Sequence, residues 1–339
     1  MAQYDIVTVG TLVRDVTMFT TQGQVLKTPG NLTAQRLIGF EYGAKIKVPQ
    51  AHFGAGGGAG NAAVTFRRLG LRVAVVSRVG NDAEGAFLKG DLARQGVDAS
   101  RVQTDAARHT AMSSIIASAK GEHDHVIFVY RGASEGLRLD SGSFSGLRPR
   151  WVYMTALTGD VWQQNAKSVF AAAARSGAKV AWNPGGEQIS AGRRALERWL
   201  KMTGVLMVNK DEAIELVLSG IKLGKRNPSF LNKPLYLLNI LSDWGPKHVV
   251  ITDGVHGVYA LHAGKVYRQK ALRRKEADTT GVGDAFGAAF IAGLQLAKGD
   301  VRLALRWGVT NAASVLTKVG AQHGILSRAE LAAQLRRTR

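Results

Sequence analysis

Short apolar segments alternate with longer amphipathic segments along most of the chain. Residues 4–10 (YDIVTVG) are rich in β-branched side chains and end at a glycine, which predicts a buried first strand. The alternation is most regular in the second half, where we expect strands at 151–154, 179–182, 205–208 and 248–252 and helices at 164–175, 193–201, 210–218 and 235–241. This pattern predicts an α/β fold whose mostly parallel sheet is covered by helices on both faces. Such sheets bind ligands beyond the carboxyl ends of their strands.

Further elements fit the same pattern, and two insertions interrupt it. We expect a strand at 73–76, a hairpin at 258–260 and 265–267, and helices at 61–69, 83–95, 284–296, 301–317 and 328–337. The insertions contain strand-like pieces at 13–19, 44–48, 109–117 and 126–130, with a polar turn at 120–124. We interpret them as a small β-rich layer that could act as a lid over a ligand.

Composition narrows the class of protein. The 339 residues carry 45 Lys and Arg against 25 Asp and Glu, a net charge of +20. This excess of positive charge has two interpretations. It could mark a surface that binds nucleic acid or acidic lipid, or it could be a general bias of the surface that also favours a phosphorylated ligand. The basic clusters at 268–275 and 336–337 contain no interleaved pattern of aromatics, so direct nucleic-acid binding is not the favoured interpretation.

The chain contains no cysteine, which excludes disulfides, a thiol nucleophile and Cys-ligated metal sites. Neither a signal peptide nor an apolar run long enough for a membrane span is visible, so we expect a cytoplasmic protein that does not cross a membrane.

The segment Asp278-Thr-Thr-Gly-Val-Gly-Asp-Ala-Phe286 is the most informative in the sequence. Glycines at 281 and 283 precede an apolar helix, so a glycine turn leads directly into a helix N-terminus. The unpaired amides and the positive dipole end of such a terminus attract anions. The segment is consistent either with a tight turn and a helix-stabilising acid, or with phosphoryl transfer that uses positioned donors and a carboxylate base.

This segment resembles the C-terminal signature of the ribokinase-like (PfkB) carbohydrate kinases, with Val282 where the family usually has alanine. The resemblance implies that Asp284 is the catalytic base. It also implies that the backbone amides of Gly281, Val282 and Gly283 form an anion hole, for which the valine side chain makes little difference.

The glycine cluster at 54–61 resembles the same family's N-terminal signature. A dinucleotide-binding fingerprint is disfavoured, because the cluster does not follow the first strand. The resemblance implies that Gly57, Gly58 and Asn61 bind substrate, and that Asp15 accepts hydrogen bonds from sugar hydroxyls. A solvent-exposed turn is the alternative for Asp15.

Two other polar groups accompany the lid strands. Arg131 follows the second pair and suits a phosphate or carboxylate of the substrate, or serves as a structural residue at a strand end. His123 and His125 flank an acid, and we favour a polar turn over a metal site because no further pair of ligands is evident.

The nucleotide side is predicted from motifs that follow strands. Asn209 and Glu212 have the spacing of a helix capping box, and they also match the family's Asn-x-x-Glu motif, in which the Glu orients Mg²⁺-bound water. Thr252, Gly254 and Gly257 resemble the family's nucleotide loop, for which a β-turn is the alternative. No Walker-type P-loop is present.

Three more assignments follow from the resemblance. Asn183 would lie near the phosphates, and Asn311, on the helix that flanks the adenine in this family, would help to bind the nucleotide. Some relatives hold a monovalent cation such as K⁺ beside the anion hole, to which Asp278 and Thr280 would contribute here.

The resemblance covers nearly the whole chain and implies a ribokinase-like three-layer α/β/α sandwich with a small β-rich lid. The expected parts are the first core strand (1–10), a lid insertion (11–53), core α/β (54–104), a second lid segment (105–132) and core α/β with the ATP-binding region (133–339).

The implied activity is an ATP- and Mg²⁺-dependent kinase that phosphorylates a hydroxymethyl group of a sugar, of the ribose or fructose type, or of a nucleoside. The alternative is a catalytically idle member of the family that acts as a basic nucleic-acid or regulatory binding protein. An exposed lid sheet could also pair across a homodimer.

Overall fold

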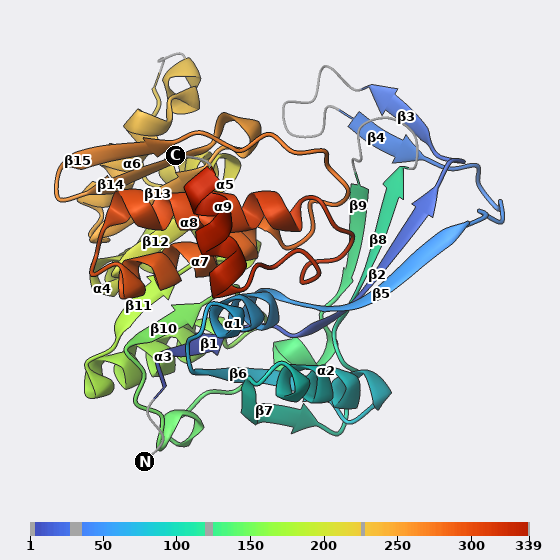
Figure 1. Cartoon of the computed structure of the whole chain (residues 1–339), viewed down its shortest axis with the longest axis horizontal. Helices are drawn as coiled ribbons and strands as arrows, with labels where there is room; N and C mark the ends of the chain where they lie inside the picture. Colours follow the sequence, from blue (N-terminus) through green and yellow to red (C-terminus); the bar gives the residue numbers. More distant parts are fainter. Residues whose placement is uncertain (1–3, 28–35, 119–124, 225–227, 338–339) are drawn as a thin grey trace.

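A nine-stranded sheet forms the centre of the larger part of the molecule (Figure 1). The computed structural model describes residues 4–27, 36–118, 125–224 and 228–337. In the order in which they pair, the strands are β15 (Lys265–Gln269), β14 (Val258–His262), β13 (His248–Thr252), β12 (Val205–Asn209), β11 (Lys179–Trp182), β10 (Trp151–Met154), β1 (Ile6–Val9), β6 (Val73–Gly80) and β7 (Asp98–Asp105). The strands from β13 to β7 are parallel, whereas β14 and β15 add an antiparallel edge.

Helices cover both faces of this sheet. One layer contains α1 (Gly58–Arg68), α2 (Ala83–Arg94), α7 (Val282–Leu296), α8 (Val301–Val315) and α9 (Arg328–Arg337). The other contains α3 (Trp162–Ser176), α4 (Gly186–Met202), α5 (Lys210–Leu218) and α6 (Pro234–Asp243). The described residues also form the short 3₁₀ helices η1 (Gly132–Gly136), η2 (Gly142–Phe144), η3 (Pro228–Asn232) and η4 (Gly254–His256).

Alternation along the strands divides the apolar residues between two cores. On β1, Ile6 packs into the core with α1 and α7, while Val7 and Val9 pack into the core with α3. Neighbouring side chains of a strand point to opposite faces, so a continuous apolar run supplies both layers. The three-layer α/β/α sandwich expected from the sequence is therefore confirmed.

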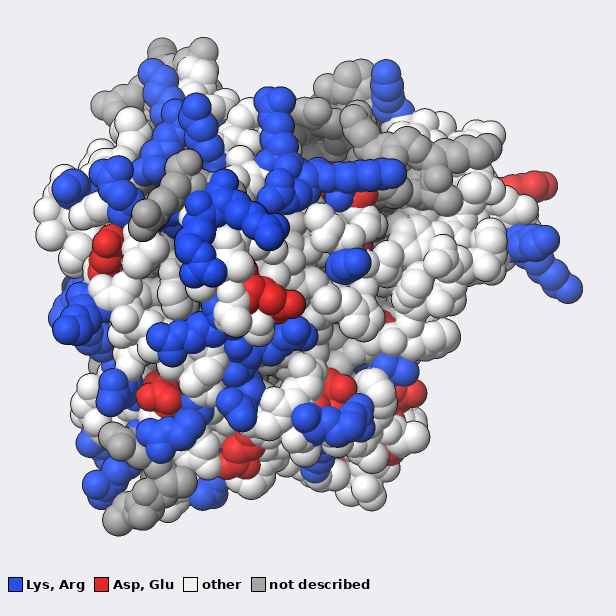
Figure 2. All heavy atoms as spheres, in the orientation of Figure 1, with Lys and Arg blue, Asp and Glu red and all other residues white. Residues whose placement is uncertain are grey.

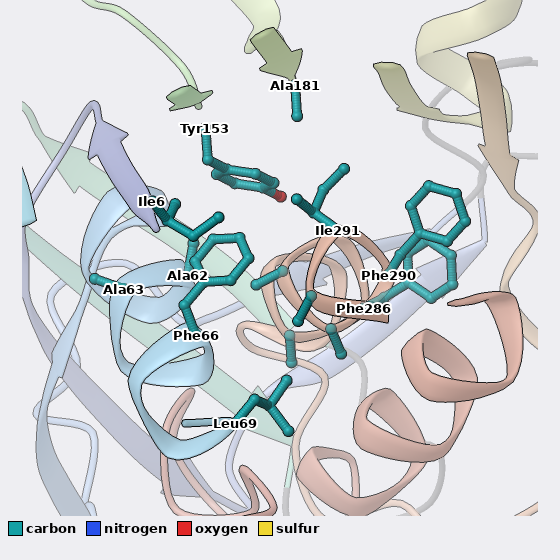
Figure 3. Packing of buried hydrophobic residues seen from close by; sticks show 14 of the residues in the cluster. Ile6, Ala62, Ala63, Phe66, Leu69, Tyr153, Ala181, Phe286, Phe290 and Ile291 are labelled. Atoms are coloured by element: carbon teal, nitrogen blue, oxygen red, sulfur yellow. The ribbon is translucent and has the colours of Figure 1, made fainter. Parts of the chain in front are cut away.

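Helix α7 is held tightly in its layer. Figure 3 shows Phe66 of α1 against the ring of Tyr153 from β10, with Ile291 of α7 close by; the two rings are 5.3 Å apart. On the other side, a Cβ at Gly293 would lie 2.7 Å from the Cα of Ala304, so α7 and α8 approach closely. This packing fixes the position of the residues at the start of α7.

The insertions form a separate small sheet, which projects from the core (Figure 1). Its strands pair in the order β5 (Gln50–Gly56), β2 (Val13–Thr20), β8 (Met112–Ser118) and β9 (His125–Tyr130), while β3 (Gln24–Lys27) pairs with β4 (Arg36–Gly39). The expected β lid is confirmed. Strand β5 continues to Gly56, three residues beyond the expected end of the first lid segment.

Some individual elements differ from expectation. Residues 44–48 form no strand, because the chain pairs with β2 through residues 50–56 instead. Strand β7 was not predicted, since its sequence DASRVQTD is mostly polar, as an edge strand permits. Helix α4 begins seven residues before the expected start and kinks at Gly192. The polar turn at 120–124, with His123, lies outside the described residues.

None of the described helices has the length and apolar character that crossing a membrane requires.

Candidate active site

The start of α7 needs glycine for a geometrical reason. Gly281 has a left-handed φ of 73°, and a Cβ there would lie 2.5 Å from the Cβ of Ala321. Helical hydrogen bonding begins only where the amide of Ala285 donates to the carbonyl of Gly281 (2.9 Å). The amides of Gly283 and Asp284 thus lie at the positive end of the helix, which is suited to an anion.

The structure brings the two glycine-rich segments together. Asn61 on α1, almost fully buried, donates from Nδ2 to Oδ2 of Asp284 over 2.9 Å. These residues are 223 positions apart in the chain. Burial raises the pKa of Asp284 above its usual value, and the hydrogen bond from Asn61 partly offsets this. The carboxyl group therefore becomes a stronger base than an exposed aspartate once it is ionised.

Asp15 lies at the same site, on lid strand β2. It is 8% exposed and accepts a hydrogen bond of 2.5 Å from the hydroxyl of Ser113, its neighbour on β8. Burial raises the pKa of Asp15 to about 6; the Ser113 hydrogen bond lowers it, while the negative charges of Asp284 and Asp278 raise it further. The carboxyl groups of Asp278 and Asp284 thus lie close enough to Asp15 to act on it electrostatically.

The glycine cluster allows the backbone to pass close to this group. A Cβ at Gly56 would lie 1.9 Å from Oδ2 of Asp15, and one at Gly57 would lie 2.5 Å from the carbonyl oxygen of Thr11. Gly57 has a φ of 87° and precedes α1, whose first residue is Gly58. These positions require glycine, because any side chain would displace Asp15 or the adjoining loop.

Arg131 lies near the lid but is paired elsewhere. Its Nε is 3.5 Å from Oε1 of Glu187 in the first turn of α4. Among the described residues, no hydrogen bond or ion pair joins Arg131 to Asp15, Asn61 or Asp284.

A cavity of about 640 Å³ opens on the other side of the α7 terminus. Its wall contains Thr252, Gly254 and Gly257 together with Val282 and Gly283. The remaining walls combine apolar and charged side chains, namely Val255, Val258, Ala271, Leu272, Phe286, Val309, Ala312, Ala313 and Leu316 with Arg273, Arg274 and Glu276, beside Thr279. An apolar pocket with a few charged groups that adjoins an anion-binding terminus has the chemistry of a nucleotide site.

Asn209 and Glu212 form the capping box of α5. The amide of Asn209 donates to Oε2 of Glu212, and the amide of Glu212 donates to Oδ1 of Asn209, each over 2.8 Å. Burial raises the pKa of Glu212, and one of its carboxylate oxygens remains outside the box. The Nζ of Lys210 lies 3.8 Å from Oδ1 of Asp253, so the start of α5 lies beside the loop that follows Thr252.

The other two asparagines predicted on the nucleotide side, Asn183 and Asn311, form hydrogen bonds within the protein. Asn183 donates to the carbonyl of Met207 over 2.9 Å and joins the ends of β11 and β12. Asn311, expected on the nucleotide side, has a fully buried side chain that uses both ends of its amide within the protein. It donates to the carbonyl of Ala285 and accepts from the amide of Leu326.

Asp278 organises the loop before α7. Its carboxylate accepts from the amide and hydroxyl of Thr280 (2.9 and 2.7 Å) and from the amide of Gly320 (2.9 Å). Within the described residues, no group of three or more His, Asp or Glu side chains is arranged to bind a metal ion. The carboxylate oxygen of Glu212 that lies outside the capping box is of the donor type that Mg²⁺ binds, directly or through water.

Two residues of the site were missed by sequence reasoning. Ser113 was hidden in a lid strand, and only its pairing opposite Asp15 reveals its role. Gln322, which donates to Oδ1 of Asn61 over 3.0 Å, lies in the loop between α8 and α9.

Positive charge is spread over the face of the molecule that Figure 2 draws. Figure 2 shows Lys and Arg side chains spread over this face, where they exceed the acidic ones. The two basic clusters of the sequence do meet, since Arg274 and Arg337 line one surface hollow of about 230 Å³.

The sequence model described as pfkB family carbohydrate kinase matches residues 30–328. The chain belongs to this family. It is therefore a PfkB sugar or nucleoside kinase, a phosphotransferase with an alcohol group as acceptor, and the resemblance seen in the sequence is confirmed.

Curated relatives of this PfkB kinase act on different acceptors. The chain is 27% identical to a ribokinase of Haemophilus influenzae, over 91% of this chain and 97% of the relative. It is 26% identical to a nucleoside kinase of Methanothermobacter thermautotrophicus, over 80% of this chain and 81% of the relative.

Solved structures share the fold. The Arabidopsis thaliana ribokinase complexed with ribose and ATP has a TM-score of 0.76 and 19% identity, with 99% of each chain covered. A putative ribokinase II of E. coli in complex with ATP and Mg²⁺ has a TM-score of 0.74 and 21% identity, with 98% and 99% covered.

Proposed function

We propose that this PfkB kinase transfers the γ-phosphoryl group of ATP to a hydroxymethyl group of a sugar of the ribose or fructose type, or of a nucleoside. The observation that carries the proposal is the hydrogen bond between Asn61 and Asp284. It joins the substrate-side segment to the helix terminus that borders the nucleotide-type cavity. The similarity to a ribokinase and to a nucleoside kinase supports this range of acceptors.

In this proposal Asp284 accepts the proton of the acceptor hydroxyl as its oxygen attacks the γ-phosphorus. The bond between the γ-phosphorus and the bridging oxygen breaks, and ADP leaves. The amides of Gly281, Val282 and Gly283 stabilise the negative charge of the transferring group. Asp15, Gly57, Gly58 and Asn61 hold the hydroxyls of the acceptor, and closure of the lid excludes water that would otherwise hydrolyse ATP.

The nucleotide would occupy the cavity bordered by Thr252, Gly254 and Gly257. We assign Asn183 and Asn209 to the ends of strands next to the phosphates. We assign Glu212, through its remaining oxygen, to the water shell of Mg²⁺. Mg²⁺ supplies charge neutralisation on the phosphates when it is bound.

We also propose a site for a monovalent cation such as K⁺ beside the loop that Asp278 and Thr280 form. Three of the lone pairs of the Asp278 carboxylate already accept hydrogen bonds, so backbone carbonyls would have to supply most of the ligands.

We also propose that the chain forms a homodimer through its lid. Strand β9 is at the edge of the lid sheet, and its Ile127, Phe128 and Val129 are 44%, 61% and 55% exposed. An exposed apolar edge strand favours pairing with another chain. Phe128→Glu is expected to convert the dimer to a monomer in light scattering, whereas a wild-type chain that is already monomeric would contradict the proposal. Cytoplasmic localisation stays a prediction.

The function is tested by measuring ADP release with a panel that contains ribose, fructose, sugar phosphates and adenosine. Release that depends on one class of acceptor is expected. The alternative, an idle family member that binds nucleic acid, predicts no acceptor-dependent ADP release together with RNA binding that weakens steeply with salt. The net charge of +20 motivates that alternative, and the intact Asp284 site argues against it.

A further inference from the structure

A hydrogen-bonded series of side-chain amides runs from Asp284 toward the surface of the core. Asn61 donates to Asp284, and the Oδ1 of Asn61 accepts from Nε2 of Gln322 over 3.0 Å. The Oε1 of Gln322 accepts from Nε2 of Gln95 over 3.0 Å, and Gln95 also donates to Oδ2 of Asp91 over 2.9 Å. The residues come from α1, α2, α7 and the loop between α8 and α9.

The carboxylates of Asp284 and Asp91, at the two ends of this series, fix the direction of every hydrogen bond in it. An amide has one end that donates and one that accepts, whereas an ionised carboxylate only accepts. Asp91 requires the NH₂ group of Gln95, whose second hydrogen serves the oxygen of Gln322. Gln322 must then present its own NH₂ group to Asn61, and Asn61 its NH₂ group to Asp284. Rotation of any one amide would place two donors or two acceptors against each other.

We infer that Gln322 is a positioning residue for catalysis: it holds the amide of Asn61 in the orientation that donates to Asp284. Without a donor at 322, the Oδ1 of Asn61 has no partner in the described network, and the amide is free to rotate by half a turn. That rotation would bring Oδ1 against the carboxylate of Asp284. This inference rests on the proposed role of Asp284 as the base.

Loss of the donor at 322 should change both the value of kcat and its dependence on pH. The hydrogen bond from Asn61 lowers the pKa of Asp284, so its loss raises that pKa. Since the base acts in its ionised form, the acid limb of kcat then moves to higher pH. Binding of ATP should be unaffected, because neither Gln322 nor Asn61 lines the cavity beside Gly254 and Gly257.

The test compares Gln322→Met, which keeps the length of the side chain but has no amide, with Gln322→Glu. Gln322→Met is expected to lower kcat about ten-fold, ~1.4 kcal/mol in the barrier, with the KM for ATP within about two-fold. Gln322→Glu is expected to lower kcat further, because an accepting group at 322 draws the NH₂ group of Asn61 away from Asp284. Gln103→Met is the matched control: Gln103 is also half-buried and uses both ends of its amide, but it lies on the edge strand β7.

A double-mutant cycle separates positioning from a general structural role. In the Asn61→Ala background, Gln322→Met is expected to change kcat by less than about two-fold, because its target is already absent. Effects that multiply, or a kcat of Gln322→Met within about two-fold of the wild type, would overturn the inference.

A readout without turnover keeps the inference apart from the proposed function. If the wild-type chain phosphorylates no acceptor, the proposed function fails. The positioning claim is then decided by titration of the Asp284 carboxyl carbon by NMR. Gln322→Met is expected to move that titration to higher pH, and an unchanged titration would refute the claim.

Discussion

Asp15 links stability to pH in a direction opposite to that of most aspartates. Its carboxyl group has a pKa of about 6, against 3.8 ordinarily, chiefly because it is buried. The folded chain therefore holds this proton more tightly than the unfolded chain, and stability falls as the pH rises from about 4 to about 6. At 1.36 kcal/mol for each pKa unit, ionised Asp15 costs about 3 kcal/mol at pH 7.

The substitution Asp15→Asn removes this cost while it keeps an oxygen that can accept from Ser113. Relative to the wild type, the variant should gain about 3 kcal/mol in free energy of unfolding between pH 4 and pH 7.5. Urea unfolding followed by tryptophan fluorescence measures the difference, since the chain has six tryptophans. A difference between variant and wild type that stays constant over this range would refute the reasoning.

Asp105→Asn serves as a control of opposite sign. Hydrogen bonds, first from the amide of Ala107, lower the pKa of this buried aspartate, and Arg78 pairs with it. Its contribution to stability is present above the pKa of the unfolded chain and is lost as the pH falls. Asp105→Asn should therefore be more destabilising at pH 7.5 than at pH 4. Asp15→Asn, by contrast, should be more stabilising at pH 7.5 than at pH 4.

Three further substitutions test separate parts of the structure. Gly281→Ala should lower kcat by at least about 100-fold, because its Cβ would collide with Ala321 and deform the anion-binding turn; a kcat near that of the wild type would contradict this role. Asn311→Ala should lower the free energy of unfolding, measured in urea, by about 2–4 kcal/mol, since it removes two buried hydrogen bonds and takes this partner from the amide of Leu326. A loss below ~0.5 kcal/mol would disprove that account. Asn61→Ala should raise the KM of the acceptor more than that of ATP, and the reverse pattern would argue against its place on the acceptor side.

The sequence predicts the core well where apolar runs are continuous. β12 and β13 stand out because both faces are buried, so nearly every position is apolar. β5 and β7 lack this signal: β5 contains glycines that accommodate Asp15, and β7 is a polar edge strand. Local patterns report burial, whereas these strands owe their pairing to tertiary contacts.

The site was predictable only in part. The glycine turns led to Asn61 and Asp284, which do lie within hydrogen-bonding distance. Asn311 was placed on the correct helix, but sequence could not show that its side chain faces the interior. Ser113 and Gln322 are common polar residues whose partners are distant in the chain, so no local pattern marks them.

The central claim is that the carboxylate at the start of α7 removes the proton of the acceptor. Its most direct test is the turnover of Asp284→Asn at saturating ATP and acceptor, with thermal unfolding as the check on folding. The account predicts an intact fold, an acceptor KM close to that of the wild type and a kcat lower by at least about 100-fold. A well-folded variant that retains most of the wild-type kcat would contradict it.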